Sequence, residues 1–397
     1  MPPMLFTPMQ IRDLTLKNRV VVSPMCQYSA VEGMLNDWHL VHLGQFSMGG
    51  CGLIIVEATA VEKRGRITYG DSGLWSDEHI APHARVVQTA KALGGAAIGV
   101  QLAHAGRKAS IQRPWEGDAA LTETEFAKGE VPWDIVAPSP IPFADGWLVP
   151  HELTAAEIAE LIEAWAAAAR RAEAAGYDML EIHSAHGYLT HSFLSPITNQ
   201  RRDAYGGSRE NRMRFALELT EAVRGAWPQG KPLFYRISSS DGKEGGWEIE
   251  DTVALARELK TLGVDVVDCS SGGIAGYGKN TMPRPTPGYQ VGFAAQVRRE
   301  AGIATQAVGL IVDPGQAETV LRAGCADLVA LARELLYDPY WAHHAAQKLG
   351  ADPDFLAWQP PYGHWLGNRA KGNFGKRIGD TDRDAAPTQT TRKQAAE

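Results

Sequence analysis

Two histidines and a tyrosine lie close together near the middle of the chain, as His183, His186 and Tyr188. If the backbone turns helically after the apolar run 177–182, His183 and His186 share one face. Two imidazoles directed at one point can hold an oxygen that becomes negative during a reaction. Tyr188, with an ordinary pKa near ~10, suits protonation of a strongly basic carbon. These residue types predict acid–base chemistry on a small molecule.

Two other interpretations of the same residues are open. A single His or Tyr in a barrel is most often a satisfied residue of the core or rim. The pair could instead bind a metal, which requires a third ligand. His191 is available for that role, but no His-Glu-x-x-His motif or Cys-His cluster accompanies it. The long polar segment 199–212 that follows is typical of a rigid, hydrogen-bonded loop at the edge of a site.

Short apolar runs rich in Val, Ile and Leu alternate with helical patterns along the chain. We expect strands at 20–23, 53–56, 97–100, 179–182, 233–237, 264–268, 304–308 and 328–331. Helices are expected at 79–93, 154–175, 209–226, 250–262, 289–301 and 314–323. A capping-box pattern at Thr154 and Glu157 and glycines at 176, 263, 302 and 324 support the helix ends. Eightfold strand–helix alternation predicts an α/β fold, a single (β/α)8 TIM barrel.

Three segments fall outside this alternation. Residues 1–18 are typical of a small hairpin that caps the bottom of the barrel. Residues 108–150 are rich in Pro and Trp and lack periodicity, which predicts a long, lid-like loop insertion after the third strand. We assign residues 1–370 to the barrel domain and expect 371–397 to be a disordered C-terminal tail.

The composition restricts the class of protein. Charged residues make up 21%, hydrophobic residues 44%, and the net charge is −7, which argues against nucleic acid as the main partner. The four cysteines never form Cys-x-x-Cys, so we expect no structural metal and a reducing cytoplasm. The start has no signal-peptide pattern, and no apolar run is long enough for a membrane span. We therefore expect a cytoplasmic protein with no membrane or nucleic-acid partner.

Chemically distinctive residues follow the predicted strands at their carboxyl ends, where TIM barrels carry their active sites. In chain order they are Pro24-Met25-Cys26, Glu57-Ala58, Gln101 with His104, His183 with His186, Arg236, Ser270-Ser271-Gly272-Gly273, Gly309, and Ala332-Arg333. The last two groups stand where barrels commonly bind phosphate through backbone N–H groups. The sequence therefore predicts one site at one end of the barrel.

Longer motifs extend the His-x-x-His-x-Tyr pattern. They are Phe193-Leu194-Ser195-Pro196 and Arg201-x-Asp203-x-Tyr205-Gly206-Gly207-Ser208-x-Glu210-Asn211-Arg212. Together with His183, His186 and Tyr188 they resemble the Old Yellow Enzyme family of FMN-dependent ene-reductases. The segment Ser23-Pro24-Met25-Cys26-x-Tyr28 is similar to the branch of thermophilic-type enzymes and xenobiotic reductases. The resemblance covers residues 4–370 and implies an NADPH dehydrogenase or ene-reductase, assembled as a homodimer or homotetramer, with FMN as cofactor and NADPH or NADH as reductant.

The resemblance also implies roles for single residues. Ser23, Pro24, Met25, Cys26, Ala58, Gln101, Arg236, Gly309, Ala332 and Arg333 would bind the cofactor, and Tyr28, His183, His186 and Trp365 would contact substrate. Within the first set, Gly309, Ala332 and Arg333 would bind the FMN phosphate. Arg236 would lie beside flavin N1, or else form a salt bridge at the barrel rim. Cys26 would touch the flavin and tune its potential, or else be an inert buried thiol.

The implied reaction is reduction of the activated C=C bond of α,β-unsaturated carbonyl and nitro compounds, with His183 and His186 holding the oxygen and Tyr188 giving the proton. Action mainly on nitro compounds, nitrate esters or quinones is the alternative. A metal-dependent hydrolase is a more distant alternative, because it would need His-x-His where the chain has Met25-Cys26-Gln27. A Schiff-base aldolase would need a lysine at the end of a strand, and the predicted strand ends offer none. A non-catalytic binding barrel would not need the histidine pair, Tyr188 and a phosphate site together. Val308 departs from an aromatic seen in some relatives. Trp365 would line its own or a neighbour's pocket, or pack as a helix residue, and Lys108 would reach the site or be solvated.

Overall fold

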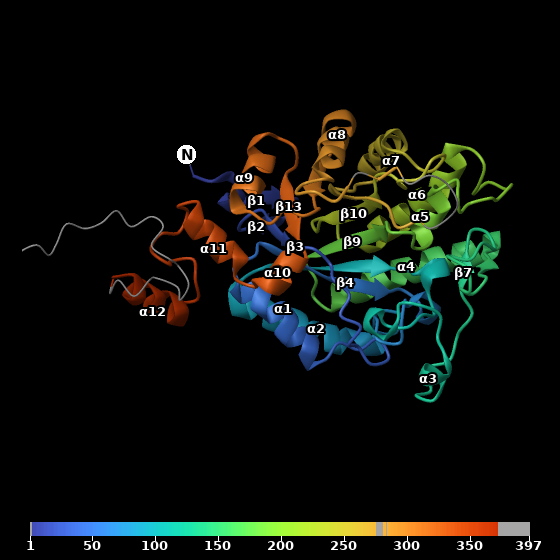
Figure 1. The fold of residues 1–397 in the computed structure, drawn as a ribbon, viewed down its shortest axis with the longest axis horizontal. Coiled ribbons are helices and arrows are strands. Elements are labelled where there is room, and N and C mark those ends of the chain that lie inside the picture. Colours follow the sequence, from blue (N-terminus) through green and yellow to red (C-terminus); the bar gives the residue numbers. More distant parts are fainter. Residues whose placement is uncertain (1, 275–280, 283, 372–397) are drawn as a thin grey trace, which may run out of the picture.

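The computed structural model describes residues 2–274, 281–282 and 284–371, and eight of its strands form a closed parallel barrel. The strands are β3 (Val20–Val22), β4 (Leu53–Ala60), β6 (Ala97–Ala103), β9 (Met179–Ser184), β10 (Leu233–Ser238), β11 (Val266–Ser270), β12 (Ala304–Ala307) and β13 (Leu328–Leu331). Neighbours pair in chain order, and β13 pairs with β3 to close the ring. The predicted (β/α)8 barrel is confirmed (Figure 1).

Helices connect the strands and surround the barrel (Figure 1). They are α1 (Asp37–Met48), α2 (Ile80–Gly94), α4 (Ala155–Ala174), α6 (Arg209–Ala226), α7 (Ile249–Thr261), α8 (Val291–Ala301), α9 (Pro314–Arg322) and α10 (Arg333–Tyr337). Thr154 and Glu157 form the predicted capping box of α4. The glycines predicted beyond four helices all have positive φ, from 64° to 88°, which a residue without a Cβ adopts at little cost.

Alternate residues of each strand belong to two separate cores. Val20, Val22, Ile54 and Val56 pack with the helices in the outer core. The residues between them, Val21, Leu53 and Ile55, pack inside the barrel with Met179, Phe234, Val266 and Leu328. This alternation is the period-2 pattern of a barrel strand. Because side chains fill the interior of the barrel, a ligand site can form only at the ends of the strands.

The inner core is closed at the bottom by the predicted hairpin. Strands β1 (Met9–Ile11) and β2 (Leu14–Leu16) pair antiparallel. Their residues Ile11 and Leu16 belong to the same cluster as the inner barrel residues. The hairpin therefore covers the end of the barrel opposite the strands' carboxyl ends.

Some boundaries differ from the predicted ones. The second strand extends to Ala60, because Thr59 and Ala60 gain a further pairing with the short strand β5 (Ser72–Gly73). The sixth strand begins at Val266 and not at 264, because the N–H of Val264 still closes the preceding helix end by bonding to Leu259 O. Both differences depend on contacts that the local apolar pattern does not encode.

The insertion after β6 contains short elements that include α3 (Glu123–Phe126) and the strand β7 (Val136–Ala137), which pairs with β8 (His151–Glu152). Near the C-terminus, α11 (Trp341–Lys348) is followed by α12 (Pro360–Lys371), which has no buried residue and lies away from the barrel (Figure 1). The tail expected at 371–397 lies outside the described residues from 372 onward. Within the described ranges, no helix has the length and apolarity needed to cross a membrane.

Candidate active site

Three aromatic side chains meet just beyond the carboxyl end of β9. The ring centroid of His183 lies 5.2 Å from that of His186 and 5.0 Å from that of Tyr188. His183 belongs to β9, whereas His186 and Tyr188 lie on the turn that leads into α5 (Leu189–Leu194). His186 has φ 59° and Gly187 has φ 78°, so the backbone bends sharply enough to bring the three rings together. The predicted grouping of His183, His186 and Tyr188 is present.

Both histidines are electrically neutral in this environment. Burial lowers the pKa of His183 and of His186 well below the ordinary value, and the nearby Arg236 lowers both further. The Nδ1 of His183 accepts the N–H of Ala185 at 3.3 Å, which leaves the ring proton on Nε2. The Nε2 of His186 lies 2.7 Å from Ser270 Oγ. Each neutral imidazole keeps one N–H and can donate it to an oxygen without carrying a charge, His183 from Nε2 and His186 from Nδ1 in the tautomer in which Ser270 donates to its Nε2.

Tyr188 keeps its proton firmly. Burial raises the pKa of Tyr188 well above the ordinary value, and nearby Cys26 and Asp71 add to the rise. Cys26 itself is a protonated thiol, since burial and the carboxylate of Glu57 raise its pKa. The pKa of Tyr28 is raised by burial and by Cys26, and its backbone is left-handed with φ 49°. The pocket thus holds protonated hydroxyl and thiol groups beside neutral imidazoles.

A layer of polar side chains lies inside the barrel below these rings. Arg236 donates from Nη1 to Ser23 Oγ at 3.0 Å, and its Nε lies 3.3 Å from Asp268 Oδ2. Gln101 Nε2 donates to Glu181 Oε1 at 2.8 Å, which turns the amide oxygen of Gln101 away from that carboxylate. Burial raises the pKa of Glu181 and of Asp268, and Arg236 opposes the rise in both. The arginine is therefore both in an ion pair and at the site.

A cavity of about 430 Å³ opens beside this layer, at the ends of β11, β12 and β13. Its lining includes Arg236, Ser270, Val308, Gly309, Ala332 and Arg333. Gly309 has φ 120°, and a Cβ there would come within 2.9 Å of Gln290 Nε2. Ala332 stands just before the first residue of α10, where helix N–H groups have no partner within the helix. These predicted phosphate-binding residues lie together on one surface.

Residues of the insertion cover the tyrosine side of the site. Trp133, Trp147 and Leu148 pack in one cluster with Cys26, Tyr28 and Tyr188. The ring of Phe143 lies 4.7 Å from that of Trp147, centroid to centroid. Apolar side chains from outside the barrel thus pack against the same buried cluster as Tyr188.

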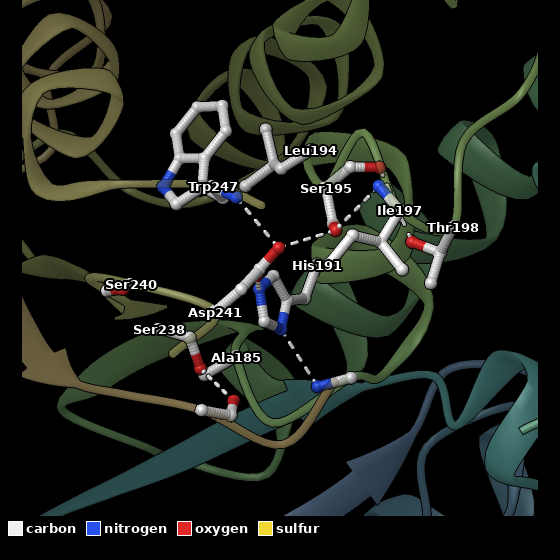
Figure 2. A network of polar contacts seen from close by, with 12 residues as sticks. Ala185, His191, Leu194, Ser195, Ile197, Thr198, Ser238, Ser240, Asp241 and Trp247 are labelled. Atoms are coloured by element: carbon white, nitrogen blue, oxygen red, sulfur yellow. Dashed lines mark hydrogen bonds and ion pairs between the residues drawn. The ribbon is translucent and has the colours of Figure 1, made fainter. Parts of the chain in front are cut away.

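A second, fully buried network supports the turn from behind (Figure 2). Gly187 donates its N–H to His191 Nδ1 at 2.8 Å, and His191 Nε2 in turn lies 2.7 Å from Asp241 Oδ1. Ser195 Oγ and the N–H of Trp247 donate to the other Asp241 oxygen at 2.6 and 2.8 Å. Both ring nitrogens of His191 therefore have hydrogen-bond partners within the protein. Across the described ranges, no group of three or more His, Cys, Asp or Glu residues could hold a metal ion.

Trp365 is not brought to this cluster. It lies on α12 with 71% of its surface exposed, so within one chain it neither packs as a helix residue nor lines the cavity. Ser270 lies at the site, as its place at a strand's carboxyl end predicted. Asp241 and Asp268 were not predicted as site residues, although a charged residue inside the apolar run 264–269 is a recognisable sign of a polar group within a barrel. Lys108, left open before, contacts Tyr188 and is described below.

Comparison with known proteins agrees with this geometry. Residues 4–352 match the sequence model of the NADH:flavin oxidoreductase / NADH oxidase family. An NADPH dehydrogenase of Geobacillus sp. (strain WCH70) is 49% identical over 352 residues, covering 88% of this chain and 96% of that protein. One of Bacillus subtilis (strain 168) is 46% identical over 350 residues, 88% of this chain and 96% of that one. The structure of morphinone reductase superimposes with a TM-score of 0.71 at 29% identity, over 88% of this chain and 91% of that one.

The barrel, its cavity and its neutral histidine pair define a flavin-dependent oxidoreductase. The chain belongs to the NADH:flavin oxidoreductase / NADH oxidase family, the Old Yellow Enzyme family. It uses FMN as cofactor and NAD(P)H as reductant. The residues present fit this group, because two arginines, Arg236 and Arg333, line one cavity with Gly309, where a side chain would narrow the space.

Proposed function

We propose that the enzyme reduces the activated C=C bond of α,β-unsaturated carbonyl and nitro compounds. The observation that carries this proposal is the cluster of two neutral imidazoles and one protonated tyrosine, with ring centroids 5.0 and 5.2 Å apart. An enone presents an oxygen that gains negative charge and a carbon that must gain a proton. The cluster offers a donor pair for the first and an acid for the second.

FMN, when bound, supplies the hydride that it has taken from NAD(P)H. The chain would hold the phosphate with Gly309, Ala332 and Arg333, and the pyrimidine edge with Gln101, whose amide orientation is set by Glu181. Ala58 would contribute a backbone contact, and Arg236 would offer positive charge beside N1. Ser23, Pro24, Met25 and Cys26 would line the same cofactor from the end of β3.

The chain's own groups then act on the substrate. His183 donates from Nε2 to the carbonyl or nitro oxygen, and His186 donates beside it, so that the double bond is polarised. Tyr28, which packs against the same buried cluster as Tyr188, also contacts the substrate. Tyr188 gives its proton to the α-carbon, while the apolar residues Trp133 and Trp147 keep water away from that carbon.

We further propose that the enzyme assembles as a homodimer or homotetramer in which α12 places Trp365 at a neighbour's pocket. The support is that Trp365 is 71% exposed although it is a large apolar residue. Light scattering on the purified protein tests this assembly, and a monomer at micromolar concentration would contradict it.

The reaction is tested by the visible spectrum of the purified enzyme under anaerobic conditions. Addition of NADPH should bleach the flavin bands, and 2-cyclohexenone should restore them. A protein that bleaches but is restored only by a quinone or a nitrate ester would refute the enone proposal and favour the alternative substrates. A hydrolase would show neither change.

A further inference from the structure

Lys108 lies across the turn that carries the proposed proton donor. It follows β6 at the end of a short 3-10 helix, Gly106–Lys108. Its Nζ donates to the carbonyl oxygen of His186 at 2.9 Å and lies 4.9 Å from the centre of the Tyr188 ring. A Cβ at Gly187 would be 3.4 Å from Lys108 Cδ, so the stem of the lysine covers that glycine. One side chain thus contacts three consecutive residues of the turn.

The same ammonium group is enclosed from the other side by the insertion. Its Nζ lies 4.7 Å from the centre of the Phe143 ring, so that it sits between two aromatic faces. A cation over an aromatic face is attracted to the ring, and more strongly where water is excluded. Lys108 therefore contacts both Phe143 of the insertion and the turn that carries His186 and Tyr188.

The charge of Lys108 is sensitive to pH. Burial lowers its pKa to about 8, Asp118 from the insertion raises it, and Arg107 on the same short helix lowers it. The other titratable groups that face it are Tyr188, which is protonated, and His183 and His186, which are neutral. Lys108 is thus mostly a cation at neutral pH and loses its charge in mildly alkaline solution.

We infer that Lys108 is a positioning residue that acts through Tyr188. The ammonium group of Lys108 stabilises the negative charge that forms on the phenol oxygen of Tyr188 as the proton leaves. The inference rests on the proposed function. In the step concerned, the O–H bond of Tyr188 breaks and its electron pair stays on the phenolate. The proton forms a C–H bond at the substrate α-carbon in the same step in which hydride adds to the β-carbon, using the C=C electron pair that this addition releases, so the rate of reoxidation reports on the proton transfer. Lys108 keeps its protons throughout, and water later returns a proton to Tyr188.

Such help is needed because burial disfavours the phenolate. The rise in the pKa of Tyr188 is the same effect seen at equilibrium. The ammonium lies 4.9 Å from the centre of the ring over which the phenolate charge spreads, and opposite charges at such a separation attract appreciably at the effective dielectric constant of a protein. Removal of the ammonium should therefore slow the proton transfer about 10- to 100-fold.

The test follows reoxidation of the NADPH-reduced holoenzyme by 2-cyclohexenone in single turnovers. Lys108→Met should slow this phase about 10- to 100-fold, whereas Lys108→Arg should keep most of the rate because it retains a cation. Bleaching by NADPH should be equal in all three proteins. The decisive comparison is made in a Tyr188→Phe background, where Lys108→Met should cause no further loss. An equal loss in both backgrounds would show a merely structural role and overturn the inference.

The pH profile is a further readout that does not depend on the comparison of double variants. Between pH 7 and 9 the wild-type rate should fall as Lys108 loses its proton, a fall that Lys108→Met should lack and Lys108→Arg should shift to higher pH. Identical pH profiles for the three proteins would overturn the inference.

Failure of the proposed function gives a different result. If cyclohexenone does not reoxidise the reduced wild type, or if Tyr188→Phe is reoxidised at the wild-type rate, the proposed function fails and the inference fails with it. If Tyr188→Phe is slow and Lys108→Met is not, only the inference fails.

Discussion

His191 Nε2 lies 2.7 Å from Asp241 Oδ1, and neither side chain is exposed to solvent. The other nitrogen of the same imidazole accepts the N–H of Gly187, between His186 and Tyr188. Because that nitrogen is an acceptor, the proton of His191 is directed at Asp241. A carboxylate on the loop after β10 thereby fixes the backbone of a turn that follows β9.

Asp241→Asn should loosen this turn. The amide offers only one acceptor oxygen, so at least one of the three donors that now bond to Asp241 loses its partner. We expect a loss of about 2–3 kcal/mol in the free energy of unfolding and about a tenfold fall in kcat, with FMN still bound. Urea denaturation and steady-state kinetics measure the two effects. The control is Ser195→Ala, which removes a bond to Asp241 without touching His191 and should lower stability but leave kcat near wild type.

The histidine pair should act when the reduced enzyme reacts with substrate, and not when NADPH reduces FMN. A His183→Ala, His186→Ala variant loses both donors to the substrate oxygen, so its reoxidation by cyclohexenone should be slower on the order of 10²–10³-fold. Stopped-flow absorbance of the prereduced variant gives this rate. Reoxidation at the original rate would refute the assignment of both residues.

Arg333 should contribute to cofactor affinity. It lines the cavity beside Gly309 and Ala332, where a charge-assisted bond to phosphate is available. Arg333→Ala should raise the Kd for FMN about 10- to 100-fold, measured by quenching of flavin fluorescence as FMN is titrated into apoprotein. The matched control is Arg299→Ala on α8, an exposed arginine that does not line the cavity and should leave the affinity unchanged.

Acid should destabilise the fold through His83. Its Nδ1 lies 2.6 Å from Tyr177 Oη, and burial lowers its pKa from 6.5 to about 3. Below pH 6.5 the unfolded chain binds a proton that the folded chain excludes, so stability is lost as the pH falls toward 3. From pH 6.5 to 5 this residue alone should cost about 2 kcal/mol. Urea denaturation at the two pH values should show a smaller fall in His83→Gln; equal falls would assign the effect to other groups.

The sequence predicted the barrel well because its signals are local. Apolar runs, the Thr154 capping box and glycines such as Gly176 each depend on a few neighbouring residues, and they marked strands and helices within a few residues of their ends. The residues at the carboxyl ends of the strands were expected to lie together because closure of the barrel brings those ends to one side; their roles in binding and catalysis stay predictions. Contacts between distant segments were not predictable in the same way. Asp241 is 50 residues from His191, and nothing near either residue announces the pairing.

Lys108 and Trp365 show the same limit in opposite directions. From the sequence, Lys108 could be either solvated or part of the site, because the insertion that buries it has no periodic pattern. The tryptophan was assigned to substrate from its motif, but the surface that would receive it is not formed by the described part of one chain. Burial of either residue depends on packing that no short segment specifies.

The apolar residues that pack with Tyr188 and the residues proposed to act in the reaction come from different parts of the chain. Trp133, Trp147 and Leu148 belong to the insertion, whereas His183 and Arg236 are rooted in strands whose ladder continues around the barrel. A substitution in the insertion can therefore reshape the space offered to a substrate without disturbing strand pairing. The substrate range can therefore change through the insertion while the proposed reaction is kept, and Phe143 connects the two parts because it also contacts Lys108.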